Sequence, residues 1–299
     1  MTDRVPFNLK DWSTERLQRV EEALSAWVPL EAPAGLGEAM RYAVLDGGKR
    51  LRPLLVLAAC EAVRGQCDAA LRAACAVELI HAYSLVHDDM PCMDDDVLRR
   101  GKPTVHVAFG QATALLAGDA LQALAFELLA PADAGIADRV QARLCRLLAR
   151  AAGHAGMAGG QAIDLAAVGR ALTEDELRHM HRLKTGALLQ ASVMMGAACG
   201  EASAAAAAGL EEYGRALGLA FQVVDDILDV TADSATLGKT AGKDALQDKP
   251  TYVSLLGLER ARAYAAELHA QAGAALARAG LPDARALQAL ADMVVHREH

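Results

Sequence analysis

Helical periodicity runs through almost all of this 299-residue chain, and it restricts the fold to packed helices. Apolar residues recur three or four positions apart, as in Leu17, Val20, Leu24 and Val28, which places them on one face of a helix. Aromatic residues make up only 4% of the chain, alanine is abundant, and few β-branched runs alternate with period two. We therefore predict an all-α protein, because alanine favours helices, whereas strands favour β-branched and aromatic residues.

Glycine and proline divide the helical pattern into segments. The pattern predicts helices over residues 14–28, 37–45, 51–64, 68–90, 105–129, 137–152, 173–199, 203–230, 251–279 and 283–295. No stretch between them is long enough to be a linker between domains, and no fixed-period repeat occurs. Because 53% of the residues are hydrophobic, the chain can build a sizeable core. We predict a single domain over residues 1–299, folded as one helix bundle.

Composition argues against several classes of protein. The net charge of −8 disfavours a general nucleic-acid binder. The six cysteines are scattered without a CxxC pair, which is typical of reduced thiols. The N-terminal residues 1–12 lack an apolar signal core, and no uninterrupted apolar run reaches about 18 residues. We therefore expect a cytoplasmic protein with no membrane span and no nucleic-acid partner.

Two aspartate clusters, each directly after an apolar helix-like run, are the strongest sign of function. The first reads DDMPCMDDD over residues 88–96, and the second reads DDILD over residues 225–229. Neighbouring carboxylates repel one another and are costly to desolvate, and divalent metals that prefer oxygen ligands would compensate them. A single acidic loop could simply be solvated. Two such clusters favour a cation site, and the missing DxDxDG spacing excludes an EF-hand.

The spacing within the clusters separates candidate ligands from supporting residues. Asp225 and Asp229 are four residues apart and share a helix face, whereas Asp226 is turned about 100° away. We therefore predict Asp225 as a direct ligand, with Asp229 beside it and Asp226 in support. In the first cluster, Pro91 cannot continue a helix, so the preceding helix should end near Asp89.

Basic residues supply the opposite charge. The segment GGKRLRP at 47–53 places Lys49 and Arg52 three residues apart, at a turn before a predicted helix. Arginine and lysine are the usual anion ligands in proteins. Further candidates are Arg99, Arg100, Lys184, Lys239 and Lys249. Metal-binding carboxylates together with these cations suggest a polyanionic substrate, such as a diphosphate.

These motifs resemble the trans-isoprenyl diphosphate synthase family from about residue 40 to 260. The resemblance is carried, in order, by GGKRLRP at 47–53, HAYSLVHDD at 81–89, RRGKPT at 99–104, LAGDAL at 116–121, GGQAID at 159–164, KTG at 184–186, FQVVDDILD at 221–229, KTAGKD at 239–244 and KPTY at 249–252. Val97 departs from the family pattern, where another acid is common, but it lies beyond the DDxxxxD core. The resemblance implies an antiparallel bundle around a deep central cavity, with one aspartate motif on each facing wall, and a homodimer.

The resemblance also implies roles for single residues. Asp88, Asp94 and Asp225 would bind three Mg²⁺ ions together with the diphosphate of the allylic substrate. That substrate would be surrounded by Arg99, Lys184, Thr185, Gln222, Lys239 and Lys249, and isopentenyl diphosphate by Lys49, Arg52, His81 and Arg100. The Thr185 carbonyl and the Gln222 amide oxygen would face the allylic cation. A charged tail at 296–299 is compatible with closure over this site.

Tyr83, with Ser84 beside it, is the predicted floor of the hydrocarbon pocket. Tyr83 lies five residues before Asp88, which is about 7–8 Å along a helix. Within the family, an aromatic residue at this place resembles the enzymes that form C15 (farnesyl) diphosphate, whereas smaller residues resemble longer-chain enzymes. We therefore predict condensation of isopentenyl diphosphate with dimethylallyl or geranyl diphosphate to (2E,6E)-farnesyl diphosphate, in isoprenoid biosynthesis.

Four alternatives remain open at this point. A C20 (geranylgeranyl) or C10 (geranyl) synthase would use the same motifs. A class I terpene cyclase needs no isopentenyl site, so the GGKRLRP segment and the second aspartate motif argue against it. A non-catalytic regulatory subunit is disfavoured because both aspartate motifs are intact.

Overall fold

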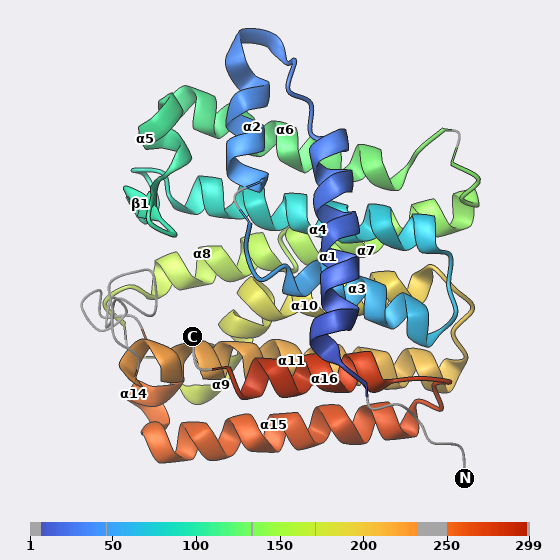
Figure 1. The fold of residues 1–299 in the computed structure, drawn as a ribbon. Helices are drawn as coiled ribbons and strands as arrows, with labels where there is room; N and C mark the ends of the chain where they lie inside the picture. The colour runs from blue at the N-terminus through green and yellow to red at the C-terminus, as the bar shows by residue number, and fades with distance from the viewer. Residues whose placement is uncertain (1–6, 46, 133, 171, 232–249, 298–299) are drawn as a thin grey trace.

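The computed structural model describes residues 7–45, 47–132, 134–170, 172–231 and 250–297. Within these ranges the chain forms a helix bundle with one short two-stranded ribbon (Figure 1). The elements are α1 (Leu9–Trp27), η1 (Pro33–Gly35), α2 (Leu36–Val44), α3 (Leu51–Ala62), α4 (Cys67–Asp88), β1 (Leu98–Arg99), β2 (Lys102–Pro103), α5 (Val105–Phe109), α6 (Gln111–Leu129), α7 (Asp138–Ala152), α8 (Met157–Ala167), α9 (Glu174–His181), the π-helical turn η2 (Arg182–Gly186), α10 (Ala187–Ala198), α11 (Ala204–Thr231), α14 (Tyr252–Leu256), α15 (Leu258–Arg278) and α16 (Arg285–Val295). The prediction of an all-α fold is confirmed.

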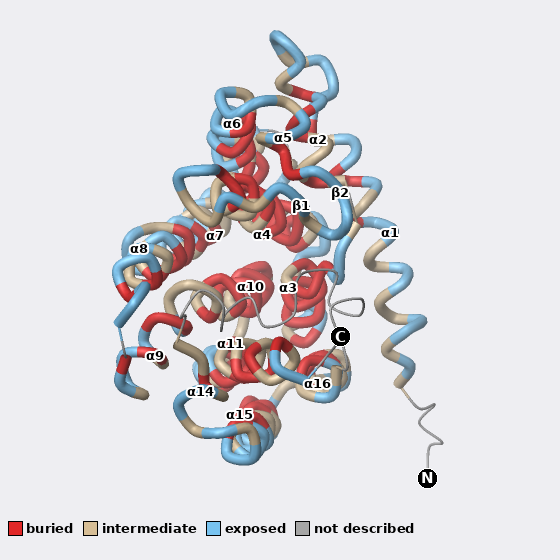
Figure 2. The backbone as a smooth tube through the Cα atoms, turned by 90° about the vertical axis from the view of Figure 1, so that its left-hand side faces the viewer, coloured by how far each residue is buried: buried red, intermediate tan, exposed pale blue. Residues whose placement is uncertain are grey.

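The bundle is organised around buried helices in its middle. α4 packs against α3 and α6, α10 packs against α3 and α11, and α15 covers α11 from outside. Figure 2 shows that α3, α4 and α10 are buried along most of their length, while α1 and α15 expose one side. Helices with apolar residues on most of their faces, such as α4 and α10, are those that a protein places in its interior.

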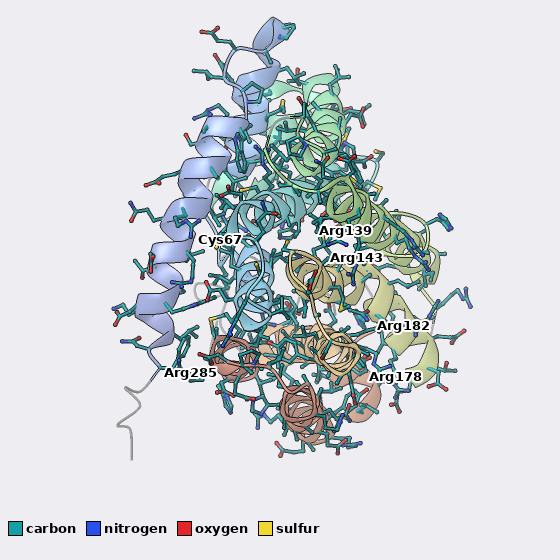
Figure 3. The ribbon with its side chains drawn as sticks, turned by 90° about the vertical axis from the view of Figure 1, so that its right-hand side faces the viewer. Cys67, Arg139, Arg143, Arg178, Arg182 and Arg285 are labelled. Atoms are coloured by element: carbon teal, nitrogen blue, oxygen red, sulfur yellow. The ribbon has the colours of Figure 1, made fainter. Side chains whose placement is uncertain are left out.

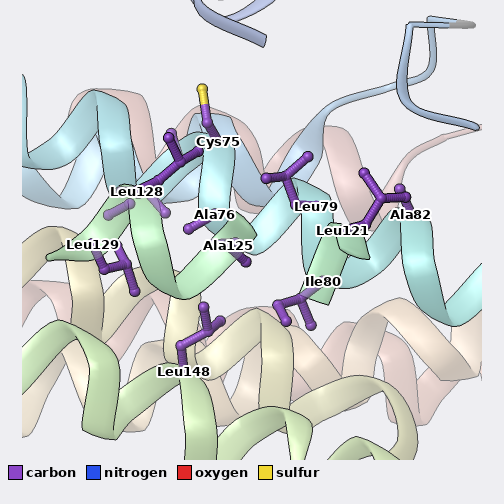
Figure 4. Close-up of a cluster of buried hydrophobic side chains, with 14 of the residues drawn as sticks. Cys75, Ala76, Leu79, Ile80, Ala82, Leu121, Ala125, Leu128, Leu129 and Leu148 are labelled. Carbon is purple, nitrogen blue, oxygen red and sulfur yellow. The ribbon is translucent and has the colours of Figure 1, made fainter. Parts of the chain in front are cut away.

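One part of the core lies between α4, α6 and α7 (Figure 4). Leu79, Ile80, Leu121 and Leu148 are completely inaccessible to solvent there. Burying a side chain of this size contributes about 1.5–3 kcal/mol. All six cysteines of the chain are unpaired, as their scattered positions predicted.

Several predicted helices are divided or were missed. Gly110 (φ +86°) separates α5 from α6, and Gly257 (φ +79°) separates α14 from α15, because a positive φ breaks a right-handed helix. The segment predicted as one helix over 173–199 contains the π-helical turn η2. The sequence did not predict α8, since Gly159 and Gly160 weaken its helical pattern.

Two helices, α4 and α6, are long and apolar enough to cross a membrane by length and composition alone. Charged residues such as Glu78 in α4 and Asp119 in α6 interrupt both helices, so neither contains an uninterrupted apolar run of about 18 residues, and the expected absence of a membrane span stays a prediction. The apolar composition of α4 is explained by its position in the core, because 72% of its most apolar 18-residue stretch is buried. Only 39% of the α6 window is buried, and α6 exposes Leu115 and Leu116 at the surface.

The arrangement of α4 and α11 positions the site. Both helices run toward the same side of the molecule, on the left in Figure 1, where β1 and α14 also lie. α4 ends at Asp88, three residues before Pro91, as predicted, and α11 carries Asp225 through Asp229 in its last turns. The two aspartate clusters therefore come from helix ends that face the same side of the bundle.

Candidate active site

A cavity of about 400 Å³ lies between α3, α4, α8 and η2. Its polar and charged lining comes from Arg52, His81, Asp88, Gln161, Lys184 and Thr185, with Tyr83, Ser84 and His87 along α4. Its apolar lining comes from Leu85, Met93, Met157, Ala158, Ala162 and Leu165. A predicted metal ligand, two predicted allylic-site residues and both predicted floor residues therefore share one cavity.

Asp88 is the last residue of α4 and carries an unfavourable charge in this cavity. Burial raises its pKa to about 6, and the charges of Asp94 and Asp89 add to the increase, while Lys184 and Arg99 oppose it. The backbone N–H of Asp94 donates to the Asp88 carbonyl at 2.9 Å, so the loop folds back on the helix end. A cation bound beside Asp88 and Asp94 would relieve this repulsion.

Asp89 points away from that site and holds Arg99. The Arg99 Nε lies 3.0 and 2.9 Å from the two carboxylate oxygens of Asp89, which is buried. Arg99 lines a neighbouring pocket together with Arg100, Lys102 and Tyr42. The structure thus brings Arg99 to this side pocket, rather than to the main cavity where the allylic site was predicted.

The residues predicted for isopentenyl diphosphate gather around the GGKRLRP loop. Arg100 Nη1 donates to the Gly47 carbonyl at 2.7 Å. Gly48 has φ +129°, and a Cβ there would lie 2.8 Å from the Arg100 guanidinium, so this position requires glycine. Burial holds the pKa of His81 well below its usual value, and the charges of Arg52 and Arg100 lower it further. His81 is therefore neutral and lies within the field of both arginines.

Arg50, the middle cation of the GGKRLRP segment, belongs to the core instead. Its Nε and Nη1 form 2.7 Å ion pairs with Glu21 and Glu78, and its Nη2 donates to the Val44 carbonyl at 2.6 Å. By contrast, Lys49 lies at the surface. Partial desolvation and the charge of Arg297 lower the pKa of its ammonium group, while the charge of Asp225 raises it. The loop therefore separates one structural arginine from the cations that face the site.

The second aspartate motif joins the cavity through Gln222. The Thr185 hydroxyl donates to Gln222 Oε1 at 3.1 Å, and Gln222 Nε2 donates to Asp226 Oδ1 at 3.1 Å. Asp226 also accepts from the Tyr252 backbone N–H at 2.8 Å. Asp226 is buried and its carboxylate is turned toward Gln222 and Tyr252, as the helix geometry predicted, and its supporting role at a metal site stays a prediction.

Lys184 lies in η2 and connects this turn to α8. Its Nζ lies 2.5 Å from Asp164 Oδ2. A Cβ on Gly160 would lie 2.1 Å from the Lys184 backbone nitrogen, so α8 and η2 are in direct backbone contact. The predicted residues Lys184 and Thr185 are thus held by a helix that the sequence did not predict.

Comparison with known proteins gives the family. The model of the polyprenyl synthetase family matches residues 33–280. The chain belongs to this family. A probable farnesyl diphosphate synthase of Sinorhizobium fredii is 52% identical over 90% of this chain and 82% of its own length. A chloroplastic geranylgeranyl pyrophosphate synthase of Capsicum annuum is 47% identical over 98% of this chain and 80% of its own length.

Comparison with solved structures supports the same family. A crystal structure of a FPP/GFPP synthase from Zymomonas mobilis superposes with a TM-score of 0.85 and 44% identity, over 96% of this chain and 99% of that chain. This polyprenyl synthetase is therefore a prenyltransferase with the isoprenoid synthase fold. Relatives named for C15 and for C20 products match it about equally well, so the family alone does not decide the product length.

The donor set of this polyprenyl synthetase fits Mg²⁺ in its chemistry. Carboxylate oxygens are the ligands that Mg²⁺ prefers. Within the described ranges, no three acidic, histidine or cysteine side chains form a ready-made metal cluster. Asp88 and Asp94 lie at and just after the end of α4, whereas Asp225 lies in the last turns of α11, so the proposed ligands come from two separate elements. The predicted residues Lys239 and Lys249 lie outside the described ranges.

Sequence reasoning missed three residues at this site. Asp164 pairs with Lys184, Gln161 lines the cavity, and Arg297 pairs with Asp225. The segment GGQAID, which holds Gln161 and Asp164, carried a signal only as part of the family resemblance. The charged tail at 296–299 was noted as compatible with closure over the site, but its pairing with Asp225 was not predicted, because Arg297 and Asp225 are 72 positions apart.

Proposed function

We propose that this polyprenyl synthetase condenses isopentenyl diphosphate with dimethylallyl and then geranyl diphosphate to form farnesyl diphosphate. The observation that carries this proposal is the shared cavity, where Asp88 and Lys184 at the polar part adjoin the apolar wall that contains Tyr83. A charged head and a hydrocarbon tail of one substrate would each find a matching surface there.

Asp88, Asp94 and Asp225 would hold Mg²⁺ with the allylic diphosphate, and the bound ions would neutralise charge on the departing diphosphate. Lys184, placed by Asp164, adds a cation beside Asp88. The C1–O bond breaks with both electrons on the diphosphate oxygen. The apolar wall keeps water from the allylic cation while the double-bond electrons of isopentenyl diphosphate form the new C–C bond. A proton then leaves to diphosphate.

Lys49, Arg52, His81 and Arg100 would bind isopentenyl diphosphate. Arg52 Nε is buried and has no hydrogen-bond partner within the described ranges, so it is available to an anion. Burial, aided by the charges of the nearby arginines, lowers the pKa of His81 and keeps it neutral, so it can donate a hydrogen bond without becoming charged. Thr185, Lys239 and Lys249 would complete the set around the allylic substrate, with Gln222 acting through Thr185 and Arg99 approaching from the neighbouring pocket.

Tyr83 supports a C15 product. Its ring is buried in the cavity wall, with its centroid 5.6 Å from that of His87 in an edge-to-face arrangement. A ring fixed in this way would stop a growing chain, whereas a small residue would let it extend. Ser84, which lines the cavity beside it, donates its hydroxyl to the His81 carbonyl at 2.8 Å and so stays close to the helix.

We further propose one catalytic domain over residues 1–299, acting in the cytoplasm as a homodimer. The exposed leucines of α6, Leu115 and Leu116, form an apolar surface that a second copy would cover, and this would explain a membrane-like helix without a membrane span. The unpaired cysteines are consistent with a reducing compartment. Light scattering should give twice the chain mass, and a monomer would contradict the dimer.

The reaction is tested by incubating the purified chain with isopentenyl and dimethylallyl diphosphates, with and without Mg²⁺. We expect a prenyl diphosphate product that chelation of the metal abolishes. Asp88→Asn and Asp225→Asn should each lower kcat/KM by about 100-fold or more, because each removes a charge that acts on the departing diphosphate. Asp138→Asn, at the exposed start of α7, is the matched control. Absence of any Mg²⁺-dependent product would overturn the proposal.

A further inference from the structure

The side-chain amide of Gln161 is buried in the cavity without a hydrogen-bond partner. Both Oε1 and Nε2 are inaccessible to solvent, and neither has a partner within the described ranges. Most buried polar side chains in proteins are hydrogen-bonded, because an unpaired buried amide costs free energy. An unpaired amide at a ligand cavity is therefore a candidate to interact with the bound ligand.

The backbone around Gln161 is fixed beside the reacting end of the cavity. Gly160 lies against the Lys184 backbone nitrogen so closely that no side chain fits between them. Asp164, one helical turn after Gly160, pairs with Lys184. Gln161 therefore lies next to Lys184 and Thr185, and all three line the same cavity as Asp88.

Gln222, the glutamine that the sequence favoured, has its amide already engaged. Its oxygen accepts from Thr185 and its nitrogen donates to Asp226. It lines a neighbouring pocket with Asp226 and Thr251 rather than the main cavity. Of these two glutamines, Gln161 is the one whose amide has no hydrogen-bond partner within the described ranges, so a rotation of its side chain would bring the oxygen into the cavity without breaking a hydrogen bond.

We propose that Gln161 turns its amide oxygen toward the allylic cation and stabilises it during the reaction. This inference rests on the proposed function. When the C1–O bond breaks and both electrons leave with the diphosphate, the hydrocarbon becomes positive over C1 and C3. An uncharged hydrocarbon cannot satisfy the amide oxygen, whereas the cation attracts its dipole. The contact is therefore stronger in the transition state than with bound substrate, which is the condition for catalysis.

The test compares binding of two analogues of geranyl diphosphate in the presence of Mg²⁺. One is a thiolodiphosphate with an uncharged hydrocarbon, and the other carries an ammonium nitrogen in place of C3. The variants are Gln161→Met, which keeps the length of the side chain, and Gln161→Glu, which keeps an oxygen. Calorimetry gives each Kd, and thermal unfolding of the unliganded variants reports folding.

We expect Gln161→Met to weaken binding of the ammonium analogue by about tenfold, the worth of one hydrogen bond to a charged group, and to change thiolodiphosphate binding less than about twofold. Its kcat should fall while KM for the allylic substrate stays near that of the wild type. Its Tm should equal or exceed that of the wild type, because an unpaired buried amide is removed. Gln161→Glu should retain the preference for the ammonium analogue.

Two outcomes would overturn the role of Gln161. One is equal weakening of both analogues by Gln161→Met, and the other is no change in either Kd. If the wild type bound the thiolodiphosphate and only this selectivity were missing, the proposed function would stand. If the wild type bound neither analogue with Mg²⁺, both the function and the role of Gln161 would fall.

Discussion

Arg297 and Asp225, the first residue of the second aspartate cluster, form an ion pair with Nη2 2.7 Å from Oδ1. The Arg297 side chain is only 10% exposed. It also donates to the Phe221 carbonyl at 2.7 Å, and its guanidinium lies 4.0 Å from the centroid of the Phe221 ring. A cation of the protein itself thus neutralises a carboxylate proposed to bind metal. A metal ion at Asp225 would compete with this guanidinium for the carboxylate.

We predict that Arg297→Gln strengthens metal binding. Without the guanidinium, Asp225 offers its full charge to a divalent cation, and the apparent Kd for Mn²⁺ should fall about three- to tenfold. Titration followed by the electron paramagnetic resonance of free Mn²⁺ measures this directly. Arg285→Gln, at the surface on α16, is the control, because Arg285 pairs with Asp283 and is far more exposed (Figure 3). Weaker Mn²⁺ binding by Arg297→Gln would show that Arg297 supports the metal site.

Replacing Tyr83 should change the length of the product. Tyr83→Ala removes the ring that closes the cavity wall, so chains longer than C15 should form. Tyr83→Phe keeps the ring and should retain the product of the wild type. Mass spectrometry of the hydrolysed products separates these results. If Tyr83→Ala still released only C15, another residue would have to form the floor.

Gly160 tests the contact between α8 and η2. Alanine at this position would place its Cβ 2.1 Å from the Lys184 nitrogen, so the helix must move. We expect Gly160→Ala to lose about 2–4 kcal/mol of unfolding free energy in urea, together with most of the activity. Gly186→Ala is the matched variant, since its Cβ would meet only ordinary contacts at 3.5 Å or more. It should stay within about 0.5 kcal/mol of the wild type. Similar losses in both variants would contradict the close contact.

The helical class and the main motifs could be predicted because they depend on local sequence. Apolar periodicity indicated the helices, and Pro91 marked the end of α4 at the first aspartate cluster. The helical spacing of Asp225 and Asp226 predicted that Asp226 points away from the Asp225 face. In the structure Asp226 is buried and accepts hydrogen bonds from the Tyr252 backbone N–H and the Gln222 amide. These inferences needed only helix geometry.

Contacts between distant segments could not be predicted in this way. Lys49 and Arg52 were the predicted ligands of the GGKRLRP segment, but the sequence did not show that Glu21 and Glu78 hold Arg50, between them, in the core. α8 escaped notice because glycines with a packing role resemble helix breakers in sequence. The Gln222 amide is hydrogen-bonded to Thr185, whereas the Gln161 amide has no partner within the described ranges. This difference depends on how α8, η2 and α11 pack against one another, which the local sequence does not determine.

His181 should make the protein sensitive to acid. Burial lowers its pKa from 6.5 to about 4, and its ring stacks on Tyr252. The unfolded chain gains a proton below pH 6.5 that the folded state does not take up until about pH 4. Stability from this group is therefore present above pH 6.5 and is lost as the pH falls to about 4. Between pH 7.5 and 5 the loss should be about 2 kcal/mol.

The matched pair His181→Phe and His179→Phe tests this assignment, because His179 is exposed on the same helix. Urea midpoints at pH 7.5 and pH 5 should move less in His181→Phe than in the wild type. His179→Phe should behave like the wild type. An unchanged acid sensitivity in His181→Phe would assign the effect to another group, such as His81, whose pKa is also lowered by burial.

Product length from the unmodified chain tests the central claim most directly. The purified protein is given Mg²⁺, isopentenyl diphosphate and dimethylallyl diphosphate, and the product mass is measured. We predict a dominant C15 diphosphate, formed by the joined metal and hydrocarbon sites with Tyr83 as the floor. A dominant C20 or C10 product would keep the reaction but contradict the floor. No Mg²⁺-dependent product would contradict the account of the site as a whole.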